Sequence, residues 1–211
     1  MNARINMGGA LLAHKVTPAD PGVAWHLRNR TRPSYLYGLV FNWLAKLFTK
    51  ATGIPTLTAE LAVKVRKASG EWIDYGVVGY RVVTNAGVAF LVDDMDPAAT
   101  TDISTLKYHG CGTGTTAEAT SDTALVTEST TALNPDSTRA TGTATQPSAN
   151  ILTSTATVTF DATAAITEHG IFSQAATGGG TLWDRTVFSA INVVSGDSIQ
   201  FAYSLTVSAG G

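Results

Sequence analysis

The chain has 211 residues, which is enough for one large domain or two modest ones, each with its own core. Charged residues make up only 14% of it, against about 25% in an ordinary soluble protein. Thr, Ser, Ala and Gly replace the missing charge, as in strand-rich proteins that bury much surface in an assembly, or simply in an all-β fold rich in Thr. The single cysteine, Cys111, excludes an internal disulfide framework.

The net charge of −2 hides an asymmetry between the two parts of the chain. Residues 1–97 carry eleven Lys and Arg against seven Asp and Glu, a balance of +4, and residues 98–211 carry three against nine, a balance of −6. We therefore expect the two parts to face different surroundings. Neither part is basic enough to predict nucleic acid as a partner.

Residues 1–34 show no sustained hydrophobic period and contain three prolines. The sequence predicts an extended N-terminal arm, with a disordered terminus as the alternative. Trp25 and His26 favour an arm that is ordered and docked. Its end carries a basic cluster, Arg28, Arg30 and Arg32. The N-terminus has no apolar stretch long enough for a secretory signal.

Residues 34–50 predict one amphipathic helix, with Ser34 as its cap and with Gly53 and Pro55 ending it. We expect its apolar stripe to pack on a sheet. The apolar run of about 14 residues is shorter than the roughly 20 that span a bilayer, so we expect no membrane insertion. The stripe comprises Leu36, Leu39, Val40, Trp43, Leu44 and Leu47. Tyr37 and Phe41 lie outside it and predict a second face that touches a partner subunit.

Residues 56–95 return to strand character. The alternation over 57–65 predicts a half-buried strand, and 71–78 and 80–84 are further strands. Asn85-Ala86-Gly87 predicts a hairpin-like turn and 88–92 a closing strand. With the helix, these strands make residues 35–97 a unit of one helix and a small antiparallel sheet.

Residues 98–211 predict an antiparallel β-sandwich, or jelly-roll-like, domain. Short strands follow one another at intervals of about ten residues, separated by Gly and Asp turns. The clearest is 198–207, whose apolar residues share one face: Ile199, Phe201, Tyr203, Leu205 and Val207. A short strand is also expected at 124–126. The protein as a whole is predicted to be mainly β.

No motif predicts an enzyme. The glycine-rich run 110–116 lacks the lysine of a phosphate-binding loop and favours a tight turn. Cys111 lies two positions from His109, which places both on one face of a strand, but a structural, partly buried cysteine is favoured over a nucleophile. Glu168-His169 has no nucleophile motif beside it. We therefore expect no catalytic residues and no cofactor.

The acidic run 93–96 is the one candidate for a metal site. Asp93, Asp94 and Asp96 offer carboxylates to calcium, but the run lacks the spacing, the glycine and the terminal glutamate of an EF-hand. A solvated loop is favoured, and we expect no metal.

Several separated motifs occur in order along the second half of the chain. They are Tyr108-His109-Gly110, 112–118, 122–128, Ile166–Phe172, Asp184–Phe188 and Gly196–Ile199. Together they resemble a broad family of small virion structural proteins of tailed bacteriophages, over roughly residues 85–211. The resemblance implies a β-sandwich building block of the particle, with no catalytic residues.

The resemblance leads us to expect a decoration or cement protein on the capsid surface, assembled in the host cytoplasm. The expected partners are the major capsid protein or other virion subunits, and further copies of the chain, with a trimer favoured. The expected contact residues are Arg28, Arg30, Arg32, Tyr37, Phe41 and Trp43. The alternatives are a neck or tail component and a receptor- or glycan-binding module that uses exposed aromatics such as Trp72 or Trp183.

Overall fold

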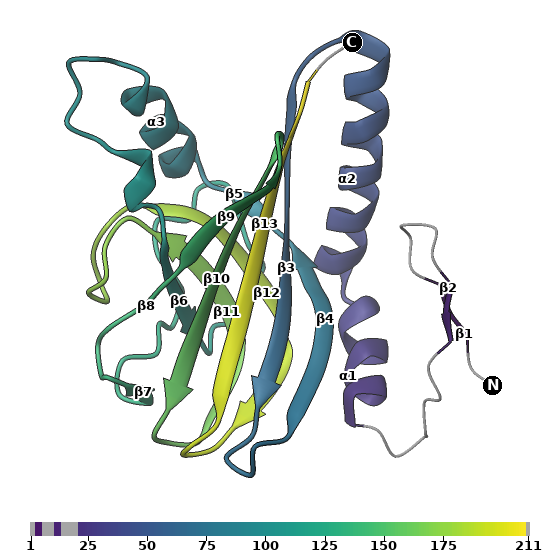
Figure 1. The fold of residues 1–211 in the computed structure, drawn as a ribbon, viewed down its shortest axis with the longest axis vertical. Coiled ribbons are helices and arrows are strands. Elements are labelled where there is room, and N and C mark those ends of the chain that lie inside the picture. The colour runs from purple at the N-terminus through teal and green to yellow at the C-terminus, as the bar shows by residue number, and fades with distance from the viewer. Residues whose placement is uncertain (1–2, 6–10, 14–20, 210–211) are drawn as a thin grey trace.

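A computed structural model describes residues 3–5, 11–13 and 21–209, with side chains from Trp25 onward. Two antiparallel sheets pack face to face as a β-sandwich, and helices stand along its sides (Figure 1). The predicted mainly β sandwich is thus confirmed. A further antiparallel pair near the N-terminus, β1 (Ala3–Ile5) and β2 (Leu11–Ala13), lies outside both sheets.

The first sheet has the strand order β4-β3-β13-β10-β7, and β9 also pairs with β10. Its strands are β3 (Thr56–Arg66), β4 (Trp72–Tyr80), β7 (Leu133–Asn134), β9 (Thr143–Ser148), β10 (Ile151–Phe160) and β13 (Ser198–Ser208). The second sheet has the order β5-β12-β11-β6-β8. Its strands are β5 (Val82–Val83), β6 (Tyr108–Gly112), β8 (Ala140–Thr141), β11 (Ala164–Phe172) and β12 (Leu182–Val193).

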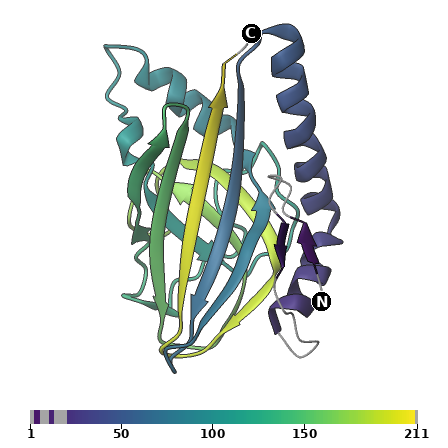
Figure 2. The same ribbon diagram turned by 45° about the vertical axis from the view of Figure 1, so that its right-hand side comes forward.

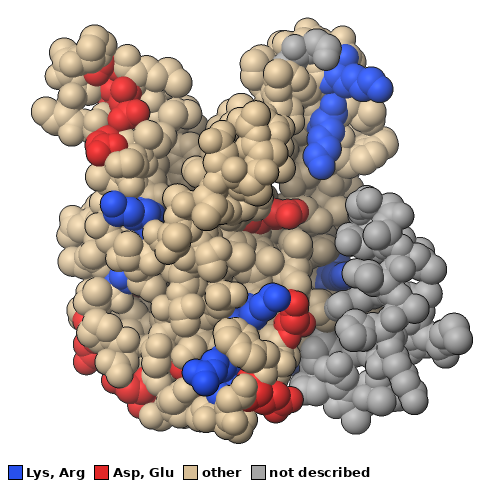
Figure 3. All heavy atoms as spheres, in the orientation of Figure 1, with Lys and Arg blue, Asp and Glu red and all other residues tan. Residues whose placement is uncertain are grey.

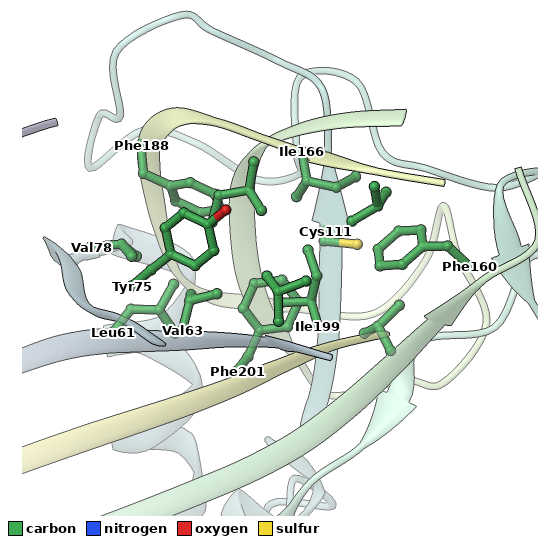
Figure 4. Packing of buried hydrophobic residues seen from close by; sticks show 14 of the residues in the cluster. Leu61, Val63, Tyr75, Val78, Cys111, Phe160, Ile166, Phe188, Ile199 and Phe201 are labelled. Atoms are coloured by element: carbon green, nitrogen blue, oxygen red, sulfur yellow. The ribbon is translucent and has the colours of Figure 1, made fainter. Parts of the chain in front are cut away.

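The core lies between the sheets, where apolar side chains from both inner faces meet (Figure 4). Alternate residues of β3 and β13 enter it, as the sequence pattern predicts. Leu61, Val63 and Phe201 contribute from the first sheet, and Ile166 and Phe188 from the second, all fully buried. The alternation ends near the chain's C-terminal end, where Leu205 is half-buried and Val207 is exposed.

The longest ladder pairs β3 with β13 in antiparallel register from Thr56↔Ser208 to Arg66↔Ser198. The predicted 35–97 segment therefore contributes strands to the same sheet as the predicted 98–211 segment. In the second sheet β5 pairs with β12, which joins the two segments again.

Three predictions of secondary-structure elements are wrong. Residues 21–30 form a helix, α1 (Pro21–Arg30), in place of the extended arm. Residues 85–94 form a helix, α3 (Asn85–Asp94), in place of a turn and a strand, because Thr84 caps it by accepting a hydrogen bond from the Gly87 N–H. No strand forms at 124–126, which lies in a loop. A short 3-10 helix, η1 (Ile103–Thr105), follows α3.

The long helix α2 (Pro33–Thr52) confirms the predicted helix and its end. Gly53 adopts a left-handed conformation with φ 73° and donates its N–H to the Thr49 carbonyl. The predicted cap is wrong: Arg32 occupies the N-cap position without a side-chain hydrogen bond, and Pro33 begins the helix. Figure 2 shows α2 standing beside the β3–β4 side of the first sheet, which it contacts.

The outer face of the second sheet is covered by the loop of residues 113–130, held by a buried ion cluster. The Glu168 carboxylate accepts from the N–H groups of Gly114 and Thr127 at 3.0 and 2.8 Å. It also accepts from Arg185 Nε at 2.9 Å, and Arg185 reaches Asp122 at 2.9 Å. Glu168 and Arg185 are fully buried, which explains why β11 and β12 lack the alternation of a half-exposed sheet.

Replacing Glu168 with Ala should destabilise the fold by about 3 kcal/mol or more, because it leaves a buried guanidinium without its main carboxylate. The free energy of unfolding from urea titration measures the effect. The matched control is Lys64→Ala, which breaks an exposed 3.4 Å ion pair with Asp74 and should cost less than about 1 kcal/mol. Equal losses in the two variants would contradict the role of the buried ion cluster in holding the loop.

Candidate functional site

The predicted contact residues lie on α1, on α2 and at the junction of the two helices. Tyr37, Phe41 and Trp43 project from α2 and are 78%, 67% and 57% exposed. Arg28 and Arg30 are exposed on the last turn of α1. The structure thus brings most of the predicted set to one side of the molecule.

Arg32 departs from the other two arginines. It is half-buried at the start of α2. Burial lowers the pKa of Arg32, while the Glu118 carboxylate acts in the opposite direction. Arg32 therefore interacts with a carboxylate in the loop of residues 113–130 of its own chain. Arg28 and Arg30 are the two exposed arginines of the predicted set.

Two residues of α1 hold this helix on the sandwich: Trp25, which the sequence predicts to dock, and Asn29, for which the sequence predicts no contact. Trp25 is buried, and its Nε1–H donates to the carbonyls of Ser189 and Ala190 at 3.0 Å. Asn29 is buried too, with Nδ2 donating to the Val78 carbonyl at 2.6 Å and Oδ1 accepting from the Ser189 N–H at 2.9 Å. The docking of Trp25 is confirmed. Arg28 and Arg30 extend from an anchored helix.

α2 contacts the sheet through its small residues. Ala45 and Thr49 are buried with Tyr35. Gly38 allows the closest approach: a Cβ at this position would lie 2.5 Å from the Tyr80 Cβ. Apart from Tyr35 near its start, the helix is therefore held by a narrow face of short side chains.

The predicted packing of the large apolar stripe on a sheet is consequently wrong. Leu36, Val40, Trp43, Leu44 and Leu47 are each about half exposed, and so is Phe48. With Tyr37 and Phe41, they form a broad apolar band on the side of α2 away from the sandwich. We call this set of eight residues the α2 band. Hydropathy alone does not distinguish a stripe that faces the core from one that faces a partner.

A hydrogen-bonded series of buried polar side chains lies between the sheets, and the sequence does not predict it. Arg81 Nη1 is 2.7 Å from His169 Nδ1, and His169 Nε2 is 3.0 Å from His109 Nδ1. His109 Nε2 is 2.9 Å from Ser154 Oγ. Arg81 also forms a fully buried ion pair with Asp184.

The direction of these hydrogen bonds follows from Arg81. A guanidinium can only donate, so His169 Nδ1 accepts and His169 carries its proton on Nε2. This proton is donated to His109 Nδ1, which leaves the His109 proton on Nε2, pointing at Ser154 Oγ. His109 therefore donates to the serine, whereas a general base must accept the serine's proton.

The arrangement is also closed to a substrate. A Cβ on Gly142 would lie 2.3 Å from Ser154 Oγ and 2.7 Å from His109 Nε2, so the backbone of Gly142 covers this pair. Cys111 is buried in the apolar core, and burial raises the pKa of its thiol. Neither the Ser154–His109 pair nor Cys111 has the exposure that nucleophilic catalysis requires.

The other candidate motifs have structural roles. Gly114 in the glycine-rich run donates its N–H to Glu168, so a carboxylate already occupies the place where a phosphate would bind. Asp94 accepts from the Ile103 N–H, and Asp96 from the Ala98 N–H. Among the described residues, no group of three or more His, Cys, Asp or Glu side chains is placed to hold a metal ion.

The two tryptophans considered for glycan binding differ. Trp183 is 4% exposed and donates from Nε1 to the Tyr203 hydroxyl at 2.8 Å, so the expectation that it is exposed is wrong. Trp72 is half exposed and lines a shallow hollow of about 310 Å³ with Lys64, Asp74 and Gln200. In the described part of the chain, no helix is long and apolar enough to cross a membrane.

Folding stability should fall as the pH drops below 6.5. Burial, aided by the charge of Arg81, lowers the pKa of His109 to about 3 and that of His169 well below its usual value. Below pH 6.5 these histidines therefore bind protons in the unfolded chain but not in the folded one. This lowers the free energy of unfolding by about 1.4 kcal/mol per pH unit for each histidine. Burial raises the pKa of Asp184 to about 6, so proton uptake there offsets at most one histidine below that pH.

Urea titrations at pH 7.5, 6.5 and 5.5 measure this dependence. In His109→Gln the amide keeps one donor and one acceptor but does not titrate. The loss of stability per pH unit should therefore be smaller by about 1.4 kcal/mol than in the original protein. Parallel pH profiles for the two proteins would show that His109 is not a neutral buried group.

Searches against protein-family models, curated proteins and solved structures found no match to this chain.

Proposed function

We propose that this protein is a non-enzymatic structural subunit of a tailed-bacteriophage particle. It binds the outside of the capsid as a decoration or cement protein and stabilises the head. The observation that carries the proposal is the α2 band, eight large apolar side chains left exposed on an anchored helix. The order of motifs in the second half of the chain, which resembles phage virion proteins, supplies the kind of particle.

The α2 band favours a permanent partner. Exposed apolar surface costs about 25 cal/mol for each Å² left in water. A contiguous patch of eight large apolar side chains is typical of an interaction surface. Aromatic residues are the commonest anchors of such surfaces, and Tyr37, Phe41 and Trp43 all lie in the band. A helix held to the sandwich through Ala45, Thr49 and Gly38 presents them with little loss of backbone entropy on binding.

Charge supports the orientation on the particle. Arg28 and Arg30 are exposed next to the start of α2 and would meet an acidic capsid surface. The more acidic second half of the chain would then face solvent. Electrostatic attraction of this kind raises the rate of association and weakens with salt.

A neck or tail subunit remains the structural alternative, and copy number separates the two. A lattice-wide decoration protein is present in a fixed ratio to the major capsid protein, whereas a ring on the particle axis has about a dozen copies or fewer. Quantitative mass spectrometry of purified virions gives this ratio. A ratio of one-to-one, or one per three, supports capsid decoration.

Glycan binding is a second candidate because Trp72 is exposed beside polar groups. An aromatic face next to the Gln200 amide and the Asp74 carboxylate is an arrangement that stacks on and hydrogen-bonds sugars. A glycan array with the purified protein tests it. Hits that disappear in Trp72→Ala would favour this role, and an array without hits would exclude it.

Replacing Tyr37 and Phe41 together with Ser should weaken binding to heads of the encoding phage assembled without this protein. Two aromatic anchors contribute about 2 kcal/mol or more each, so a loss of about 1,000-fold in affinity is expected. Co-sedimentation with the heads at a series of protein concentrations measures it.

The matched control is Trp72→Ser, which removes an aromatic residue of similar exposure from β4 and should leave the affinity unchanged. Replacing Arg28 and Arg30 with Ala should reduce the salt dependence of binding. If the Tyr37/Phe41 variant binds heads as the original protein does, α2 is not the capsid-binding surface.

A further inference from the structure

Two helices project from the same end of the sandwich on opposite sides. In Figure 1, α3 and the loop after it stand at one upper corner and α2 at the other, with the sheets between them. Figure 3 shows acidic atoms gathered over the α3 corner and basic atoms over the α2 corner. The two projections therefore carry opposite charge.

One edge of the α2 band is bordered by lysines. Successive residues of a helix are 100° apart, so Leu36, Val40, Trp43 and Leu47 form one stripe of the band. Lys46 and Lys50 lie three residues after Trp43 and Leu47 and flank this stripe; both are exposed. The other edge of the band, with Tyr37 and Phe41, has no charged neighbour on α2.

α3 carries a matching stripe with the opposite charge. Val88, Val92 and Met95 are spaced i, i+4, i+7 and are 49%, 59% and 72% exposed, with Met95 at the C-cap. Asp93 and Asp96 each follow a residue of this stripe by one position and are exposed as well. The α3 stripe is therefore an apolar row with an acidic border.

The charges of both helices lack counterparts within the described chain. Asp93 and Asp94 lie in the last turn of α3, where the partial negative charge of the helix terminus disfavours carboxylates, and no basic residue is present in that turn. α2 contains no acidic residue, and among the described residues neither Lys46 nor Lys50 forms an ion pair. Lys46 acts on the Glu60 carboxylate from a distance: burial raises the pKa of Glu60, and the charge of Lys46 lowers it by less.

We propose that the lysine-bordered stripe of α2 docks on the α3 stripe of a second copy of this chain. Trp43 and Leu47 pack against Val92 and Met95 of the neighbouring copy. Lys46 and Lys50 lie opposite the aspartates, where they offset the unfavourable charge at the end of α3. Each contact then buries the apolar stripes of both helices and places their opposite charges next to each other.

This contact is head-to-tail because it joins two different surfaces. Since α2 and α3 lie on opposite sides of one molecule, each copy uses both surfaces. Repeated head-to-tail contacts form a ring where the rotation between copies closes and an open filament where it does not. A contact between two α2 helices would instead place lysines near lysines with no carboxylate on either helix. Charge complementarity thus favours the head-to-tail contact over a contact between two α2 helices.

The expected contact is modest in strength. The seven side chains of the two stripes leave on the order of 700 Å² exposed, which is below the 1,200 Å² or more of a stable interface. A single contact should therefore have a dissociation constant in the micromolar range or weaker. Self-association should depend on concentration.

The inference does not depend on the capsid proposal. Trp43 then belongs to the contact between copies, and the Tyr37 and Phe41 edge of the band stays free for the particle. Self-association is measured on the purified chain without heads. A failure of capsid binding leaves the α2–α3 contact between copies untouched, and the reverse also holds.

Sedimentation velocity of the full chain, from about 10 μM to about 1 mM, tests the contact. Reversing the α2 border with Lys46→Glu and Lys50→Glu should weaken association about ten- to hundredfold. Reversing the α3 border with Asp93→Lys and Asp96→Lys should weaken it as much. The chain with all four substitutions should associate to within about threefold of the original protein, because the complementarity is restored.

The matched control is Lys64→Glu with Arg66→Glu, which changes the net charge equally at exposed positions of β3 and should leave association unchanged. Circular dichroism checks that each variant is folded. A chain that stays monomeric up to 1 mM overturns the proposal. The proposal is also overturned if the Asp93→Lys, Asp96→Lys variant associates like the original protein. The same holds if the chain with all four substitutions does not regain association.

Discussion

The antiparallel ladder between β3 and β13 is the constraint on which the rest of the structure depends. It runs from Thr56↔Ser208 to Arg66↔Ser198 and places the early and late parts of the chain in one sheet. Leu61, Val63, Ile199 and Phe201 thereby meet in the core with zero or almost zero exposure. α2 leads directly into β3, so the same ladder sets where the exposed helix stands.

The sequence predicts those elements whose hydrophobic period and whose capping or turn residues indicate the same structure. The alternation in β13 and the Gly53 stop of α2 are examples, since a two-residue period and a left-handed glycine are properties of a few neighbouring residues. The sequence does not predict α3, because its β-branched residues favour a strand. The Thr84 cap and packing against β12 stabilise the helix instead. Propensity was overridden by tertiary contact.

The candidate site shows the same division. Tyr37, Phe41 and Trp43 could be identified as unusual from the sequence, but which side of α2 meets the sheet depends on the fit of Gly38 against Tyr80, between residues far apart in the chain. The polar chain from Arg81 through His169 and His109 to Ser154 joins four strands or strand ends, and no spacing along the sequence reveals it. Its hydrogen-bond direction follows only once Arg81 is placed beside His169.

The position of β3 has a mechanical consequence. This strand is hydrogen-bonded on both sides, to β13 over its whole length and to β4 from Glu60 to Arg66. A pull on α2 along the strand direction loads these bonds in parallel, so that many must shear together instead of opening one by one. The exposed helix α2 is in this way attached to the body of the protein through a strand that is hydrogen-bonded along both edges.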